Sequence, residues 1–170
     1  MLARNDLWFK WFLYAMAALL CIAVQTALLQ RITLWGVIPF IYPLVAAIPA
    51  SFEGPAAGAL YGLCIGVLCD SLLPGPIPCF YTLLFLVTAI LSGVLAHGLL
   101  SAGMVCSLAI SVLAFLLLAL FHCLCLWFRG SAAWGAGLFV MVRELLVTLP
   151  LAFPVTYLFR AVRRRAYIDE

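Results

Sequence analysis

The sequence predicts an all-α membrane protein, a compact bundle of about six transmembrane helices forming one domain over residues 1–170. Two features of its composition indicate this class. Of the 170 residues, 68% are hydrophobic and only 9% are charged, whereas about a quarter of the residues of a soluble domain are charged. Because one span needs about 20 apolar residues, the chain has room for about six spans and for no globular domain beside them.

Apolar runs, interrupted by proline, glycine and charged residues, mark the expected spans. They are residues 11–29, 34–52, 54–73, 79–96, 104–128 and 138–159. The first run follows the basic residues Arg4 and Lys10. Basic residues also precede the apolar core of a signal peptide. This first run is longer than the roughly 7 to 15 residues of such a core, and no small-x-small cleavage site follows. We therefore expect it to remain as an anchor.

The second expected span contains three prolines, Pro39, Pro43 and Pro49. Proline removes a backbone donor and clashes with the preceding turn, so we expect an irregular helix. Glu53 follows at a short turn before the third span. An acid at the start of a helix favours the positive end of the helix dipole, so we expect Glu53 to cap the third span.

The third span carries Gly54, Gly58, Gly62 and Gly66 at every fourth position, with Asp70 at the next place in the series. In water these glycines would weaken a helix by about 1 kcal/mol each. In a bilayer the backbone must bond to itself, so the helix forms and the glycines make a groove that another helix can approach closely.

The last three spans follow a stiff outer turn, residues 74–78, whose sequence is Pro-Gly-Pro-Ile-Pro. Residues 79–96 return inward, and residues 104–128 are long enough to tilt. Residues 138–159 contain the charged pair Arg143 and Glu144.

Basic residues gather at the two ends of the chain. Six of the nine lie there: Arg4, Lys10, Arg160, Arg163, Arg164 and Arg165. Positively charged segments flanking membrane spans stay in the cytoplasm. We therefore expect both termini to be cytoplasmic, which requires an even number of spans.

Four ionisable residues are expected in the outer half of the membrane: Asp70, His122, Arg143 and Glu144. A charge at the centre of a membrane helix costs at least about 2.5 to 3.5 kcal/mol, so such groups pair or face water. We expect Asp70 to pair with Arg143. We expect the negative charge of Glu144 to be neutralised by Arg129, by Arg31 or by protonation. We interpret this polar cluster either as a binding pocket or proton relay, or as a set of contacts that hold the helices together.

Motifs of catalysis are missing, since the chain has no HExxH, GxSxG or Walker-type sequence. We expect neither an enzyme nor a bound cofactor. The seven cysteines include no CxxC pair and lie mostly within apolar runs, which is typical of small buried hydrophobes and not of a metal site. The short arginine-rich tail offers no surface for nucleic acid but can touch anionic lipid.

The third span resembles the glycine-rich signature of MreD, the family of rod shape-determining membrane proteins. The resemblance lies in the pattern Gly58-x3-Gly62-Leu63-x2-Gly66-Val67-Leu68-x-Asp70. The chain length, the composition and the ending Leu149-Pro150-x3-Pro154 before a basic tail are also similar to that family. The chain departs from it at Tyr42-Pro43-Leu44, where no acid stands, and in the proline-rich turn after Asp70.

The resemblance implies a non-enzymatic scaffold of the cell-elongation machinery in the bacterial cytoplasmic membrane. Such a scaffold would bind the single-span protein MreC and, through it, the actin-like MreB filament and the glycan polymerase and transpeptidase of lateral wall growth. The fold of the family is similar to the substrate-binding subunits of energy-coupling factor transporters. The alternative is therefore a vitamin-binding transporter subunit, which would need an outward cavity with converging polar groups.

Overall fold

The computed structural model describes residues 4–98, 103–130 and 134–167, and in these ranges the chain forms helices and no β-strand. The helices are α1 (Arg4–Ala27), α2 (Tyr42–Glu53), α3 (Pro55–Leu72), α4 (Phe80–Gly98), α5 (Met104–Phe128), α6 (Trp134–Thr148) and α7 (Ala152–Tyr167). Short 3₁₀ turns, Leu29–Arg31 and Leu149–Leu151, follow α1 and join α6 to α7. The all-helical class predicted from the composition is confirmed.

Within the ranges that the structure describes, five helical segments are long and apolar enough to cross a membrane. They are Trp8–Arg31, Pro55–Leu72, Phe80–Gly98, Met104–Phe128 and Gly135–Arg165. The last combines α6 and α7 into one path of 31 residues. Pro150 stands in the turn between them, where its missing N–H prevents a regular α-helix.

The expected second span, residues 34–52, is not one helix. Only its second part is helical, because α2 begins at Tyr42 and has 12 residues. Twelve residues extend about 18 Å, which is too short for a hydrocarbon layer of about 30 Å. Before it, Trp35 and Gly36 form a tight turn with positive φ angles of 53° and 77°. Proline explains the break, since Pro39 cannot donate a helical hydrogen bond and Pro43 lies in the first turn of α2.

Helix α2 lies at the centre of the bundle. Every residue from Tyr42 to Phe52 is buried, and the helix contacts α1, α3, α4, α5 and α7. Three alanines in it, Ala46, Ala47 and Ala50, have no exposed surface. Their small side chains let neighbouring helices approach from several directions, as is typical of membrane bundles.

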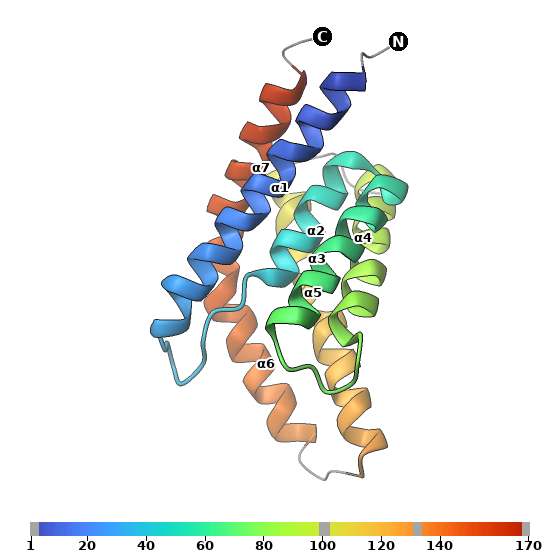
Figure 1. Cartoon of the computed structure of the whole chain (residues 1–170). Helices are drawn as coiled ribbons and strands as arrows, with labels where there is room; N and C mark the ends of the chain where they lie inside the picture. Colours follow the sequence, from blue (N-terminus) through green and yellow to red (C-terminus); the bar gives the residue numbers. More distant parts are fainter. Residues whose placement is uncertain (1–3, 99–102, 131–133, 168–170) are drawn as a thin grey trace.

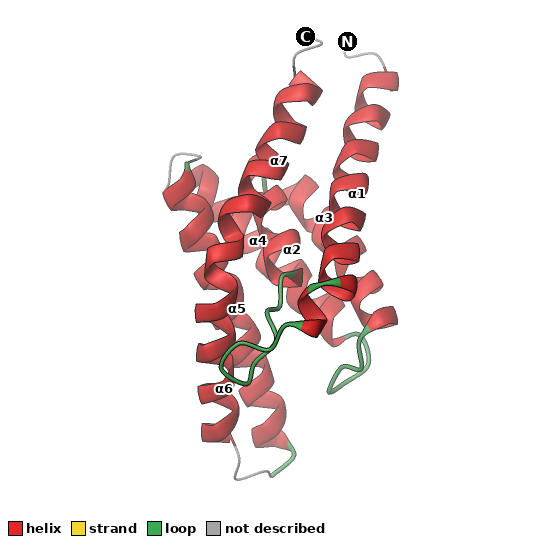
Figure 2. Cartoon of the chain, turned by 90° about the vertical axis from the view of Figure 1, so that its left-hand side faces the viewer, coloured by secondary structure: helices red, strands yellow, loops and turns green. Residues whose placement is uncertain are grey.

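The first turn of α1 and the last turn of α7 lie at the same end of the bundle (Figures 1 and 2). The path between them therefore crosses the bundle an even number of times, and residues 32–41 together with α2 make the second crossing. At the opposite end, the α5–α6 hairpin extends beyond the turns formed by residues 32–41 and 73–79 in both views (Figures 1 and 2).

Candidate functional site

The glycines of α3 lie against the chain's own helices. A Cβ atom on Gly58 would come within 2.7 Å of the Ala50 Cβ on α2. On Gly62 it would lie 2.6 Å from the Ala89 Cβ on α4, and on Gly66 it would lie 2.5 Å from the Thr82 Cα. The groove thus receives α2 and α4, and its glycines are buried. The close helix approach expected from the four-residue glycine spacing is therefore made by helices of this chain, and it leaves no free surface there for a helix of another protein.

Gly54 has a different role from the other three. It joins α2 to α3 with a φ of 89°, a conformation that glycine adopts without strain. A Cβ there would meet the His97 Nε2 at 3.5 Å. Gly54 therefore allows the sharp reversal between two helices, while Gly58, Gly62 and Gly66 allow close packing.

Asp70 caps the start of α4. Its carboxylate accepts hydrogen bonds from the backbone N–H groups of Tyr81 (3.0 Å) and Thr82 (2.9 Å) and from the Thr82 hydroxyl (2.5 Å). The short turn after α3 brings this carboxylate to the N-terminus of α4, where N–H groups are unpaired and the helix dipole is positive. The expected ion pair with Arg143 is wrong: no basic side chain among the described residues lies within 4.0 Å of Asp70.

The other three members of the predicted polar cluster lie apart. The Arg143 side chain is exposed, donates a long hydrogen bond of 3.5 Å to the Trp35 carbonyl oxygen, and lies 4.2 Å from the centre of the Phe139 ring. His122 is half-buried, with its ring 6.2 Å from that of Phe80. Within the described ranges, no hydrogen bond or ion pair joins any two of the four predicted residues.

Glu144 is half-buried on α6 and forms no ion pair with either arginine expected to answer it. Arg129 instead donates a hydrogen bond to the Pro76 carbonyl oxygen, which joins the end of α5 to the turn before α4. Consecutive residues point about 100° apart on a helix, so the side chains of Arg143 and Glu144 lie in different surroundings. The four residues do not form one ligand pocket.

A second polar cluster, which the sequence analysis missed, surrounds Glu53 at the end of α2. The Tyr14 hydroxyl donates a hydrogen bond of 2.8 Å to one carboxylate oxygen, and the Lys10 ammonium forms an ion pair with the other. Only 7% of the Glu53 side chain is exposed. The expected capping of the third span is wrong, since Gly54 occupies the cap position and no side chain caps α3. Lys10 and Tyr14 stand four residues apart, a spacing that places them on one helix face and could have indicated a shared partner.

Two buried polar side chains satisfy the non-helical backbone before α2. The Gln25 side chain donates to the Pro39 carbonyl oxygen (2.7 Å) and accepts from the Ile41 N–H (3.0 Å). The Thr148 hydroxyl of α6 accepts a hydrogen bond of 3.0 Å from the Phe40 N–H. Irregular backbone at membrane depth is tolerated where protein groups replace the missing helical bonds. Gln25 and Thr148 therefore make the broken second crossing possible.

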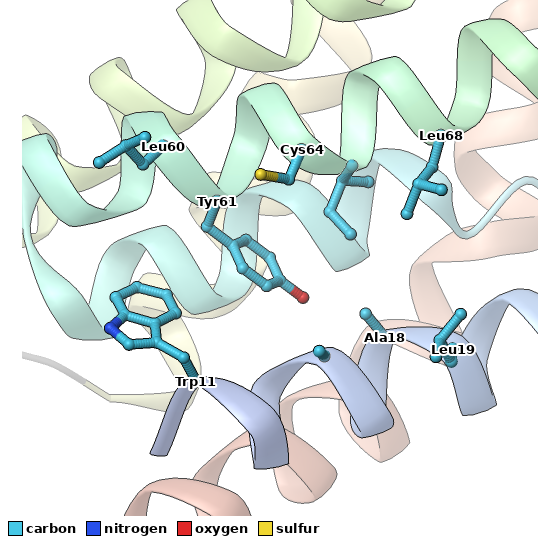
Figure 3. Close-up of a pocket in the computed structure, with 9 residues that line it drawn as sticks. Trp11, Ala18, Leu19, Leu60, Tyr61, Cys64 and Leu68 are labelled. Carbon is cyan, nitrogen blue, oxygen red and sulfur yellow. The ribbon is translucent and has the colours of Figure 1, made fainter. Parts of the chain in front are cut away.

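A groove of about 480 Å³ separates α1 from α3 (Figure 3). Its walls are Trp11, Ala15, Ala18 and Leu19 on α1 and Leu60, Tyr61, Cys64, Ile65 and Leu68 on α3. Each wall covers eight residue steps, or about 12 Å of helix. Apart from Tyr61 and the Trp11 indole, these side chains offer no strong hydrogen-bonding group, so the groove suits apolar membrane material.

The Tyr61 hydroxyl is the unusual group in this groove. Tyr61 is 7% exposed and points from α3 toward α1, with its oxygen in the space near Ala18 and Cys64 (Figure 3). No described residue hydrogen-bonds to that oxygen. A buried hydroxyl without a partner costs about 1–3 kcal/mol. Since the oxygen itself is buried, an occupant of the groove would have to displace neighbouring side chains to reach it.

Metal-binding chemistry has no support in the described residues, where no three His, Cys, Asp or Glu side chains gather. Four of the free cysteines, Cys21, Cys69, Cys106 and Cys125, are buried, as expected of small apolar side chains.

Comparisons with protein-family models, with curated proteins and with solved structures gave no match for this chain.

Proposed function

We propose that this chain is a non-enzymatic scaffold of the MreD kind in the bacterial cytoplasmic membrane. In this proposal it belongs to the cell-elongation machinery and binds an MreC-like protein through that protein's single transmembrane helix. The partner would connect it to the MreB filament and to the glycan polymerase and transpeptidase of lateral wall growth. The MreD-like pattern that ends at Asp70 is the link to this machinery.

The groove between α1 and α3 is the observation that carries the partner-binding part of the proposal. It is open along a helical length of about 12 Å, enough for two turns of a docked helix. Leu19, Leu60 and Leu68 on its walls are 52%, 68% and 42% exposed. They would be covered by a helix packed between them, and small residues such as Ala15 would let that helix approach closely.

The positions of the polar groups support a scaffold better than a vitamin-binding subunit. A ligand site needs several polar groups that converge on one cavity. Here the Asp70 carboxylate holds α4, and Arg143 faces outward on another helix. The position of the first turn of α1 and the last turn of α7 at one end of the bundle also fits the proposed topology with cytoplasmic termini and a fold similar to energy-coupling factor subunits.

Depletion of the protein in its bacterial host tests the assigned role. We expect rounded or widened cells with unchanged uptake of vitamins. Normal cell width combined with a vitamin requirement would overturn the scaffold assignment in favour of a transporter.

Filling the groove tests the docking surface directly. Ala15 is exposed and lines the groove, so Ala15→Phe should occupy it without disturbing the core. We expect co-purification of the MreC-like partner to fall about 5- to 150-fold, the change in affinity that a steric penalty of about 1–3 kcal/mol produces. Leu83→Phe on the exposed face of α4 is the matched control and should leave co-purification unchanged. Equal recovery from both variants would refute the proposed groove.

A further inference from the structure

Arg143 is a charged side chain with little to bind within its own chain. Its guanidinium donates one long hydrogen bond, 3.5 Å, to the Trp35 carbonyl oxygen and lies 4.2 Å from the centre of the Phe139 ring. Among the residues that the structure describes, no carboxylate lies within 4.0 Å of it. A guanidinium has five N–H donors, so most of its hydrogen-bonding capacity is unused here.

Beside Arg143, the exposed side of α6 forms a shallow apolar groove. This groove has a volume of about 520 Å³ and is lined by Trp35, Phe139, Val142, Arg143 and Leu146. The four uncharged residues are between 46% and 72% exposed. A cation thus lies beside a continuous apolar strip, which is the chemical complement of a molecule with an anionic head and a hydrocarbon tail.

The groove lies at the level of the turn that holds Trp35. Arg143 contacts Trp35, which lies in the tight turn at the end opposite the two termini. The α5–α6 hairpin extends beyond that turn (Figures 1 and 2). Arg143 is therefore at the level of the turn that holds Trp35, about 13 Å of helix inward from the start of α6 at Trp134, and tryptophan is enriched at membrane interfaces.

We propose that Arg143 binds the phosphate group of a membrane phospholipid whose acyl chain lies along Phe139, Val142 and Leu146. Guanidinium and phosphate form charge-assisted hydrogen bonds, frequently two in parallel, which would use the free donors of Arg143. The apolar strip would receive the hydrocarbon that follows the phosphate. Glu144, on the neighbouring face of α6, is half-buried and leaves the positive charge of Arg143 without a counter-ion from its own helix. This lipid site is independent of the partner groove between α1 and α3.

Native mass spectrometry of the purified full-length chain tests the site. The probes are phosphatidylglycerol and a diacylglycerol with the same acyl chains, which differ only in the phosphate headgroup. We expect retention of phosphatidylglycerol over diacylglycerol, and about a tenfold loss of that preference in Arg143→Gln, since hydrogen bonds to charged groups contribute about 1.5–3 kcal/mol. Arg31→Gln removes an exposed arginine that lies outside the groove and should keep the full preference.

Two further measurements make the outcome decisive. Arg143→Lys keeps the positive charge but loses the planar guanidinium, so it should retain an intermediate preference for phosphatidylglycerol. The same variant also shows whether loss of the arginine alone unfolds the protein. Equal retention of the two lipids by the unsubstituted chain, or equal loss in Arg143→Gln and Arg31→Gln, would overturn the proposal. Displacement of phosphatidylglycerol by a co-purified helix carrying an Asp or Glu would also overturn it and would assign Arg143 to a protein carboxylate.

Discussion

Replacing Gly62 with alanine is the sharpest test of how α3 packs. The added Cβ would lie 2.6 Å from the Ala89 Cβ and 2.6 Å from the Phe85 carbonyl oxygen on α4. Carbon atoms in contact are normally about 3.5–4.0 Å apart, so the two helices would have to separate by about 1 Å. The carbonyl oxygen belongs to backbone and cannot rotate away. Overpacking of this kind costs about 1–3 kcal/mol.

Gly135→Ala is the matched control for this substitution. Gly135 is also helical, but nothing lies within 4 Å of the position that its Cβ would occupy. Both variants gain the helical preference of alanine over glycine, about 0.5–1 kcal/mol. The difference in stability between them therefore isolates the steric cost at the α3–α4 contact.

Thermal unfolding in detergent, followed with a thiol-reactive fluorescent dye, measures this difference. Buried thiols such as Cys69 and Cys106 become reactive only when the bundle opens. At about 2–4 °C per kcal/mol for a chain of this size, Gly62→Ala should unfold about 2–12 °C below Gly135→Ala. Equal unfolding temperatures for the two variants would refute the close packing of Gly62 against α4.

Three more substitutions test the polar groups that hold the bundle. Asp70→Ala should lower stability by about 0.5–2 kcal/mol, the usual value of a helix cap, because it frees the N–H groups that start α4; a wild-type unfolding temperature would contradict the capping role. Glu53→Gln should destabilise by roughly 1–3 kcal/mol in the same thermal assay, because it removes the carboxylate that accepts from Tyr14 and pairs with Lys10. Lys10→Met should cost less in the Glu53→Gln background than alone, since the ion pair is already lost there; simple additivity would argue against the ion pair. Gln25→Leu should cost about 1–3 kcal/mol and accelerate hydrogen exchange at the Ile41 amide, which loses its acceptor; unchanged exchange there would show that the amide has another partner.

The sequence was a good guide where composition and spacing decide the structure. The apolar runs correctly indicated helices throughout the described residues, with several segments long and apolar enough to span a membrane, because a chain in lipid must satisfy its backbone internally. The four-residue spacing of the glycines correctly indicated close helix approach, since such residues form one surface of a helix. The spacing could not identify which helix approaches. Periodicity shows which side of one helix carries the glycines, but it gives no information about the neighbour that lies there.

The polar residues were harder to place for the same reason. Asp70 was assigned to Arg143 by charge alone, although α4 begins only ten residues after it and presents unpaired N–H groups. The prolines of the second expected span predicted irregularity but not where the helix would begin. That position depends on Gln25 and Thr148, which are far apart in the sequence and meet the broken backbone only after folding. The groove around Tyr61 is a property of two separated helices and has no local signal.

Enclosure of α2 by five other helices sets an order for the biosynthesis of this protein. Twelve residues cannot anchor themselves across a bilayer, and the Phe40 N–H finds its acceptor in Thr148, 108 positions later. While the ribosome is still producing the second half of the chain, the segment from residue 32 to residue 53 lacks some of the helices that bury it in the folded bundle. The bundle can close around this segment only after α7 emerges. A chain truncated before Ala152 would therefore leave the side of α2 that contacts α7 uncovered.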